Sequence, residues 1–115
     1  MTVTIYHNPR CSKSRQTLAL LEEKGVTTEI VLYLENPPAK AELKSLVKKL
    51  GLSSARDLMR VKEDVYKGLD FATKTSESAL IDAMVENPIL IERPIVVNGE
   101  KAAIGRPPEA VLEIL

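Results

Sequence analysis

The residue best suited to chemistry in this chain is Cys11, the only cysteine among its 115 residues. It stands in the run HNPRCSKSR, residues 7–15, where a short apolar stretch gives way to a predicted helix. The first amides of a helix have no partner within it and carry a partial positive charge, so they favour a thiolate over a thiol. The same amides could hold an oxyanion, with Arg10, Lys13 and Arg15 beside them. The sequence therefore places a nucleophile and an anion-binding loop within one short segment.

The spacing around Cys11 separates several kinds of cysteine chemistry. A lone cysteine is more often a buried structural residue, but the polar and cationic neighbours of Cys11 argue against that interpretation. A phosphatase loop needs an arginine six positions after its cysteine, and Thr17 occupies that position. A C-x-x-C dithiol cycle needs a second cysteine where Ser14 stands. A catalytic cycle built on Cys11 must therefore obtain its second thiol from outside the chain.

The composition is that of one ordinary globular domain. Hydrophobic residues make up 44% of the chain, and 16 basic side chains balance 16 acidic ones. A net charge of zero gives no bulk attraction to nucleic acid or to an anionic membrane. The N-terminal run MTVTIYHNPR lacks the apolar stretch of a signal peptide, and a single cysteine forms no internal disulfide. We therefore expect a cytoplasmic protein with no nucleic-acid or membrane partner, and a monomer is one option for its oligomeric state.

The first third of the chain predicts a strand, a helix and a second strand. Residues 3–6 are apolar and β-branched enough for a short buried strand. A helix is expected to begin near Ser12 or Ser14 and to stop at Gly25, the residue type favoured just after a helix end. Residues 28–32 predict a second strand, which is parallel to the first if the helix is a crossover connection.

The middle of the chain, at about residues 39–86, is predicted to be a helical insert. Its first helix carries apolar residues at helical spacing from Leu43 to Leu50 and closes at Gly51. Residues 61–75 are mixed and polar, with only weak helical character. A short helix is expected with Ser53 as its N-cap and Met59 as its last residue. A further helix is expected to have Thr75 or Ser76 as its N-cap and to stop at Asn87-Pro88.

The last part of the chain predicts a hairpin followed by a short helix. Two apolar runs flank Asn98-Gly99, the strongest short signal for a tight hairpin. The RPP run at residues 106–108 is expected to open a helix. The order strand, helix, strand, helical insert, hairpin and helix is the thioredoxin-like arrangement. The sequence therefore predicts a single α/β domain over residues 1–115, with a mixed four-stranded sheet.

Several motifs along the chain resemble one family. The chain is similar to the arsenate reductases that work with glutathione and glutaredoxin, and the resemblance covers nearly its whole length. The segments that carry it are HNPRCSKSR at residues 7–15, LYLENPP at 32–38, Leu58-Met59-Arg60, NPILIERPIVVNG at 87–99 and GRPPE at 105–109.

The resemblance gives a role to three arginines that are far apart in the sequence. Arsenate is a doubly charged oxyanion, so its approach to a thiolate brings two anions together, a repulsion that guanidinium groups offset. Any one arginine alone would more often be a surface residue with no measurable role. The resemblance implies that Arg60, Arg93 and Arg106 line the Cys11 pocket as substrate-binding residues. It also implies that the Arg93-Pro94 peptide bond is cis.

Two further residues receive supporting roles. His7 is the single histidine, and a packed or solvated side chain is its simpler interpretation, since no second histidine suggests a metal site. The resemblance puts a histidine at this position, where it could help to favour the Cys11 thiolate. Ser14 is expected either to donate a hydrogen bond to that thiolate or to cap the helix. We expect no metal and no bound cofactor.

The resemblance also implies a reaction. The Cys11 thiolate attacks arsenate held among the arginines and forms a thiol–arsenate adduct. Glutathione, as cosubstrate, supplies the second thiol and the electrons, and arsenite is released. Glutaredoxin then regenerates Cys11 from its mixed disulfide with glutathione.

Two other functions remain open at this point. Redox-responsive regulators of the same fold family bind RNA polymerase, but they typically use a C-x-x-C switch that Ser14 removes here. A switch confined to Cys11 would need glutathionylation or an intermolecular disulfide. The other function is a glutathione-linked thiol reductase acting on another substrate. The run Cys11-Ser12-Lys13-Ser14 also departs from the Cys-Gly-Thr-Ser loop of the best-known reductases.

Overall fold

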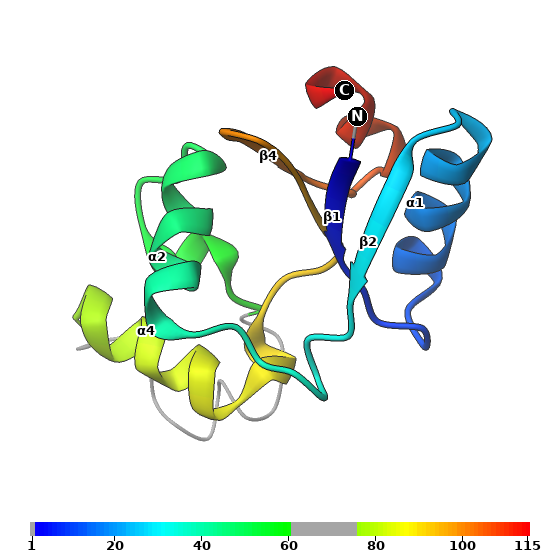
Figure 1. The fold of residues 1–115 in the computed structure, drawn as a ribbon. Helices are drawn as coiled ribbons and strands as arrows, with labels where there is room; N and C mark the ends of the chain where they lie inside the picture. The colour runs from blue at the N-terminus through cyan, green and yellow to red at the C-terminus, as the bar shows by residue number, and fades with distance from the viewer. Residues whose placement is uncertain (1, 61–75) are drawn as a thin grey trace. The chain divides into compact units, whose positions relative to one another are not determined.

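The computed structural model describes residues 2–60 and 76–115, and the chain divides into two compact units (Figure 1). Unit 1 comprises Met1–Asn36 and Arg93–Leu115, and unit 2 comprises Pro37–Glu92. The expected helical insert, at about residues 39–86, falls within unit 2. Over the described ranges, no helix is both long enough and apolar enough to cross a membrane.

Unit 1 contains a mixed four-stranded sheet in the order β2-β1-β3-β4, which confirms the predicted fold class. β1 pairs in parallel with β2 and antiparallel with β3, while β3 and β4 form a hairpin. Helix α1 connects the two parallel strands, as a crossover must. The elements are β1 (Thr2–Tyr6), α1 (Ser12–Glu23), β2 (Thr27–Val31), β3 (Ile95–Asn98), β4 (Lys101–Ile104) and the 3-10 helix η3 (Pro108–Ile114).

The core of unit 1 lies between the sheet and the two helices α1 and η3. Val3 and Ile5 are two residues apart in β1, so their side chains emerge on the same face of the sheet. Both are fully buried and pack with Leu21 of α1 and Val111 of η3. This packing fixes α1, and with it the start of the helix at Cys11, against β1.

The end of α1 follows the sequence signal. Gly25 has a φ of +71°, a conformation that costs glycine little. The amide of Gly25 donates to the Glu22 carbonyl at 3.0 Å, and the amide of Val26 donates to the Leu21 carbonyl at 3.2 Å. These two bonds form the Schellman motif that satisfies the last carbonyls of a helix. The predicted stop at Gly25 is confirmed.

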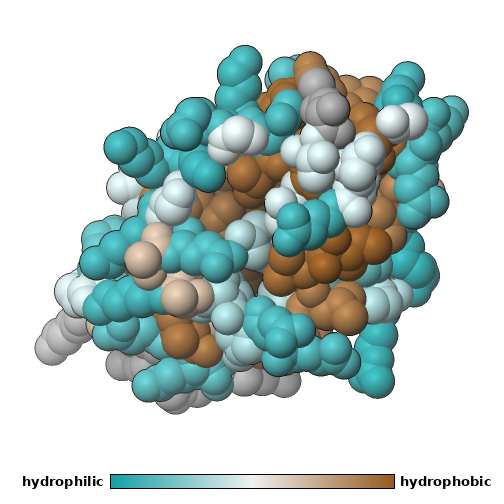
Figure 2. All heavy atoms as spheres, viewed as in Figure 1, coloured by the Kyte–Doolittle hydropathy of each residue, from teal (hydrophilic) through white to brown (hydrophobic). Residues whose placement is uncertain are grey.

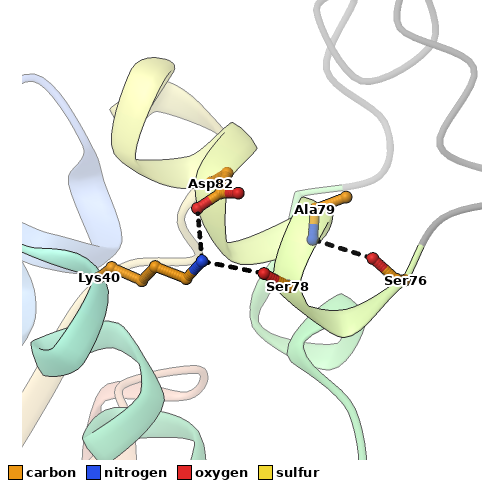
Figure 3. A network of polar contacts seen from close by, with 5 residues as sticks. All are labelled: Lys40, Ser76, Ser78, Ala79 and Asp82. Carbon is orange, nitrogen blue, oxygen red and sulfur yellow. Dashed lines mark hydrogen bonds and ion pairs between the residues drawn. The ribbon is translucent and has the colours of Figure 1, made fainter.

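Unit 2 is helical in its described part, with α4 in contact with α2 and with both of its 3-10 helices. Ser76 is the N-cap of α4 and accepts a hydrogen bond from the Ala79 amide at 3.2 Å (Figure 3). It is one of the two residues that the sequence predicted for this cap. Lys40 at the start of α2 reaches Ser78 at 2.9 Å and Asp82 at 3.0 Å on α4 (Figure 3). The elements are α2 (Lys40–Lys49), η1 (Ala55–Leu58), α4 (Glu77–Glu86) and η2 (Pro88–Leu90).

The expected short helix after Gly51 differs in its cap and its end. Ser54, and not Ser53, is the N-cap of η1, and its hydroxyl accepts a hydrogen bond from the Arg56 amide at 3.1 Å. Ser53 instead bonds the Asp57 carboxylate at 3.3 Å. The helix ends at Leu58, because Met59 is extended and forms an isolated bridge with Ile91. The weak helical character expected at residues 61–75 lies outside the described residues.

The hairpin is present, but its turn is shifted by one residue. Asn98 pairs with Lys101, so Gly99 and Glu100 form the two-residue loop. Gly99 supplies the positive φ, +63°, that the turn requires. Asn98 is held in the strand because its side-chain amide donates to the Ile114 carbonyl at 2.7 Å. That contact with η3 explains why asparagine ends the strand and does not enter the turn.

Candidate functional site

Cys11 is the N-cap residue of α1, as its place before the helix suggested. Its backbone is extended, with φ −92° and ψ 123°, and its carbonyl accepts the Arg15 amide at 3.0 Å. The side chain is half-buried, and the first turn of α1 contains no acidic residue. Because Cys11 is the N-cap, the interpretation of Ser14 as the helix cap is wrong. The sulfur therefore lies at the N-terminal end of α1, where the first backbone amides have no partner within the helix.

The loop before Cys11 is held by a network centred on Ser14, whose side chain is fully buried. The Ser14 hydroxyl oxygen lies 2.6 Å from Nδ1 of His7 and accepts the Asn8 amide at 3.0 Å. Asn8 in turn accepts the Cys11 amide on its carbonyl and the Arg10 amide on Oδ1, each at 3.0 Å. These bonds fix the approach of the chain to Cys11. The predicted hydrogen bond from Ser14 to the thiolate stays a prediction.

His7 is a buried, neutral imidazole. Burial first, and the positive charge of Arg15 second, lower the pKa of His7 from its ordinary value of 6.5. In a neutral ring, either Nδ1–H donates a hydrogen bond to the Ser14 oxygen or the Ser14 hydroxyl donates one to Nδ1. His7 therefore positions the loop at neutral pH and carries no charge with which to stabilise an anion.

The lowered pKa of His7 predicts how stability depends on pH. The unfolded chain binds a proton at His7 near pH 6.5, whereas the folded chain binds it only at a lower pH. The free energy of unfolding should therefore fall as the pH drops below 6.5, by at most about 1.4 kcal/mol per pH unit. In His7→Gln, the part of this loss that is due to protonation of His7 should be absent as the pH falls from 7.5 to below 6.5. Urea unfolding across this range measures the slope, and parallel slopes for the two proteins would contradict the assignment.

The Arg106 side chain contacts two other predicted site residues, Cys11 and Arg93. Its Nη2 lies 3.7 Å from the Cys11 sulfur, and its Nε donates to the Arg93 carbonyl at 2.8 Å. The Arg106 side chain is exposed, so a solute can reach it. The Arg93-Pro94 bond is cis, which confirms that expectation, and the Arg106-Pro107 bond is cis as well. A guanidinium group and a half-buried thiol thus meet at the start of α1.

Arg60 belongs to unit 2. Its backbone amide donates to the Leu90 carbonyl at 2.7 Å, and its Nε lies 3.8 Å from the Glu92 carboxylate. Its side chain is 24% exposed, enough for contact with a ligand. The role of Arg60 at the Cys11 pocket stays a prediction.

Gly105, which sequence analysis missed as a functional residue, sets the position of Arg106. Its amide donates to the Pro94 carbonyl at 2.9 Å. A Cβ atom added here would lie 2.8 Å from Cγ of Pro94, and closer still to the hydroxyl oxygen of Thr17. Thr17 is a fully buried residue of α1, so the chain can approach the helix this closely only at a glycine. The motif GRPPE contained this glycine, but close packing against another element leaves no signal in the sequence.

Gly105→Ala is therefore expected to impair activity as well as stability. The added methyl must push the Arg106 segment away from α1, which carries Cys11, and small displacements of this kind cost up to about a hundredfold in rate. Overpacking should also lower the free energy of unfolding by about 1–3 kcal/mol. Combining it with Thr17→Ala removes the closest contact and should restore part of both losses. Kinetics and urea unfolding test this, and a fully active Gly105→Ala variant would show that the contact does not position Arg106.

The arrangement fits thiol chemistry on an anion. Within the described ranges no cluster of three or more His, Cys, Asp or Glu side chains could hold a metal ion. Cys11 offers a nucleophile, Arg106 offers charge-assisted hydrogen bonds to oxygen atoms, and the start of α1 offers a positive potential.

Comparisons with known proteins agree with this arrangement. A profile of the ArsC family matches residues 6–114. YfgD of Escherichia coli (strain K12), described as uncharacterized, is 65% identical over 98% of this chain and 96% of its own length. An arsenate reductase of Haemophilus influenzae is 55% identical over 100% of both chains. The solved structure of an arsenate reductase from Vibrio cholerae has a TM-score of 0.98 and 55% identity, covering 100% of this chain and 98% of that one. By its sequence and by its thioredoxin-like mixed sheet, the chain belongs to the ArsC family.

Proposed function

We propose that the protein reduces arsenate to arsenite, with Cys11 as the nucleophile and glutathione and glutaredoxin as the source of electrons. The observation that carries the proposal is the Arg106 guanidinium, 3.7 Å from the Cys11 sulfur at the N-terminus of α1. The names of the relatives from Haemophilus influenzae and Vibrio cholerae support arsenate as the substrate.

The first step forms a bond between sulfur and arsenic. The Cys11 thiolate attacks the arsenic atom, and one arsenate oxygen leaves as water after taking up protons from solvent. Arsenic remains in the +5 state, and the adduct keeps negatively charged oxygens. Arg106 is placed to bind these oxygens as they approach the thiolate, which reduces the repulsion between the two anions.

The second step transfers the electrons. The glutathione sulfur attacks the Cys11 sulfur, and the electron pair of the sulfur–arsenic bond passes to arsenic, which leaves as arsenite in the +3 state. The two sulfurs are thereby oxidised to a Cys11–glutathione disulfide. A glutaredoxin thiolate then attacks the glutathione sulfur and releases the Cys11 thiolate. Cys11 is the only cysteine of the sequence, which is why the second thiol is assigned to glutathione.

A coupled assay tests the function. With glutathione, glutaredoxin, glutathione reductase and the protein present, arsenate should start the consumption of NADPH, and omission of either thiol donor should slow it. Consumption that does not depend on arsenate would instead favour a thiol reductase acting on another substrate. Capture of RNA polymerase subunits without arsenate turnover would favour the regulator.

A further inference from the structure

A cavity of about 280 Å³ lies directly beside the loop that leads into Cys11, entirely within unit 1. One wall is formed by residues 7–10 and the other by Leu32, Leu34 and Glu35, which follow β2. We call it the loop cavity. Its volume is near the lower limit of small-molecule sites, roughly 300 Å³, so it suits a single amino-acid moiety better than a whole tripeptide.

Both walls of the loop cavity are held in place by hydrogen bonds. The His7 amide donates to the Val31 carbonyl at 2.9 Å, which ties the loop to β2. Arg15 of α1 donates to the Pro9 carbonyl at 3.0 Å. On the other wall, the amides of Glu35 and Asn36 both donate to the Leu32 carbonyl at 2.9 Å and close a tight turn. The cavity is therefore formed before a ligand arrives, and binding does not require the walls to be ordered.

The lining combines an apolar surface with two opposite charges. Pro9, Leu32 and Leu34 supply the apolar part, and Leu34 is 42% exposed. Figure 2 shows apolar surface where β2 ends, next to hydrophilic side chains. Arg10 and Glu35 are both exposed, one on each wall, and neither forms an ion pair with another described residue. A ligand with a carboxylate, an ammonium group and a short methylene chain would match all three features.

We propose that the loop cavity binds the γ-glutamyl group of glutathione, an inference that rests on the proposed function. The α-carboxylate pairs with Arg10, the α-ammonium pairs with Glu35, and the two methylene groups lie against Leu32 and Leu34. The cysteinyl part of the tripeptide then extends toward Cys11, the residue that directly follows Arg10. The glycine end needs no contact in the cavity.

An open groove of about 570 Å³ between α1 and η3 is the competing site. Its lining includes Lys13 and Gln16 of α1 and Glu109 of η3. It also offers charges of both signs, but it is twice the size of the loop cavity and more open to solvent. Glu109→Gln therefore tests whether the ligand binds in this groove.

The proposal predicts which part of glutathione is recognised. At saturating arsenate, γ-glutamylcysteine should support turnover with nearly the kcat/KM of glutathione, because it keeps the group that the cavity binds. Cysteinylglycine, which lacks that group, should have a kcat/KM at least about tenfold lower, because it loses at least one charge-assisted contact. Glu35→Gln should reduce this preference to about twofold while the KM for arsenate stays the same. Glu29→Gln, an exposed carboxylate of β2 outside the cavity, is the matched control and should keep the full preference.

Three results would overturn the proposal. Equal use of the two dipeptides by the unmodified protein would show that the γ-glutamyl group is not recognised. An unchanged preference in Glu35→Gln would place that recognition elsewhere. Loss of the preference in Glu109→Gln alone would place the ligand in the groove.

A binding measurement separates this proposal from the proposed function. S-methylglutathione cannot react, so its calorimetric affinity is measurable even if arsenate is not turned over. Binding that is about tenfold weaker in Glu35→Gln than in Glu29→Gln would support the cavity as the site in either case. Equal affinities in these two variants would overturn it, even if arsenate reduction is confirmed.

Discussion

Replacing Cys11 with serine is expected to reduce arsenate turnover to below about one thousandth of the original rate, the scale seen when a nucleophile is lost. The serine hydroxyl is not ionised at neutral pH and cannot form a disulfide with glutathione. Cys11 is the N-cap of α1, and serine is among the best N-cap residues. The melting temperature of Cys11→Ser should therefore be equal to or higher than that of the unmodified protein. Coupled NADPH consumption and thermal unfolding measure the two effects.

This combination of lost activity and kept stability distinguishes a nucleophile from a structural cysteine. A structural, tightly packed thiol would give the opposite pattern, with lower stability and activity kept in proportion to the folded fraction. Appreciable arsenate reduction by a fully folded Cys11→Ser variant would remove Cys11 from the reaction.

Arg106→Lys should lower kcat/KM for arsenate by roughly tenfold to a hundredfold, the equivalent of about 1–3 kcal/mol for a lost charge-assisted contact. Lysine keeps the charge but loses the fork with which Arg106 reaches the Arg93 carbonyl and the Cys11 sulfur together. Arg93→Lys and Arg60→Lys should have losses of similar size if all three arginines bind the oxyanion. Steady-state kinetics at varied arsenate measure the effect, and the melting temperatures should barely move.

Arg56→Lys is the control for these three variants. Arg56 is a half-buried arginine of η1 and is not among the residues proposed to bind the oxyanion, so its replacement should have a much smaller effect on kcat/KM. Equal losses for Arg56→Lys and the other three variants would mean that the wrong arginines were chosen. Unfolding of the lysine variants would show instead that these side chains support the structure.

The sequence carried enough local information to predict most of the fold. Gly25 and Gly51 mark helix ends because both take a positive φ, which few other residues accept. Alternating β-branched and apolar residues identified the strands, and the hairpin followed from one asparagine–glycine pair. The placement of Cys11 at the start of a helix was predictable for the same reason, since it depends on neighbours in the sequence.

What the sequence could not show depends on contacts between distant residues. Asn98 stays in its strand because it bonds to η3, a contact 16 residues away, so the turn moved by one position. The approach of Gly105 to Thr17 joins two elements that no local pattern connects. The loop cavity likewise needs two segments, and neither Glu35 nor Leu34 carries a functional signal on its own.

The most direct test of the central claim is the mass of the protein after one turnover without glutaredoxin. Arsenate and glutathione together should leave one glutathione per chain, bound to Cys11 and released by a reducing agent, while glutathione alone should leave none. Arsenite should appear in an amount equal to the modified protein. Arsenite formation without this modification, or modification that does not depend on arsenate, would contradict the role of Cys11 in the reaction.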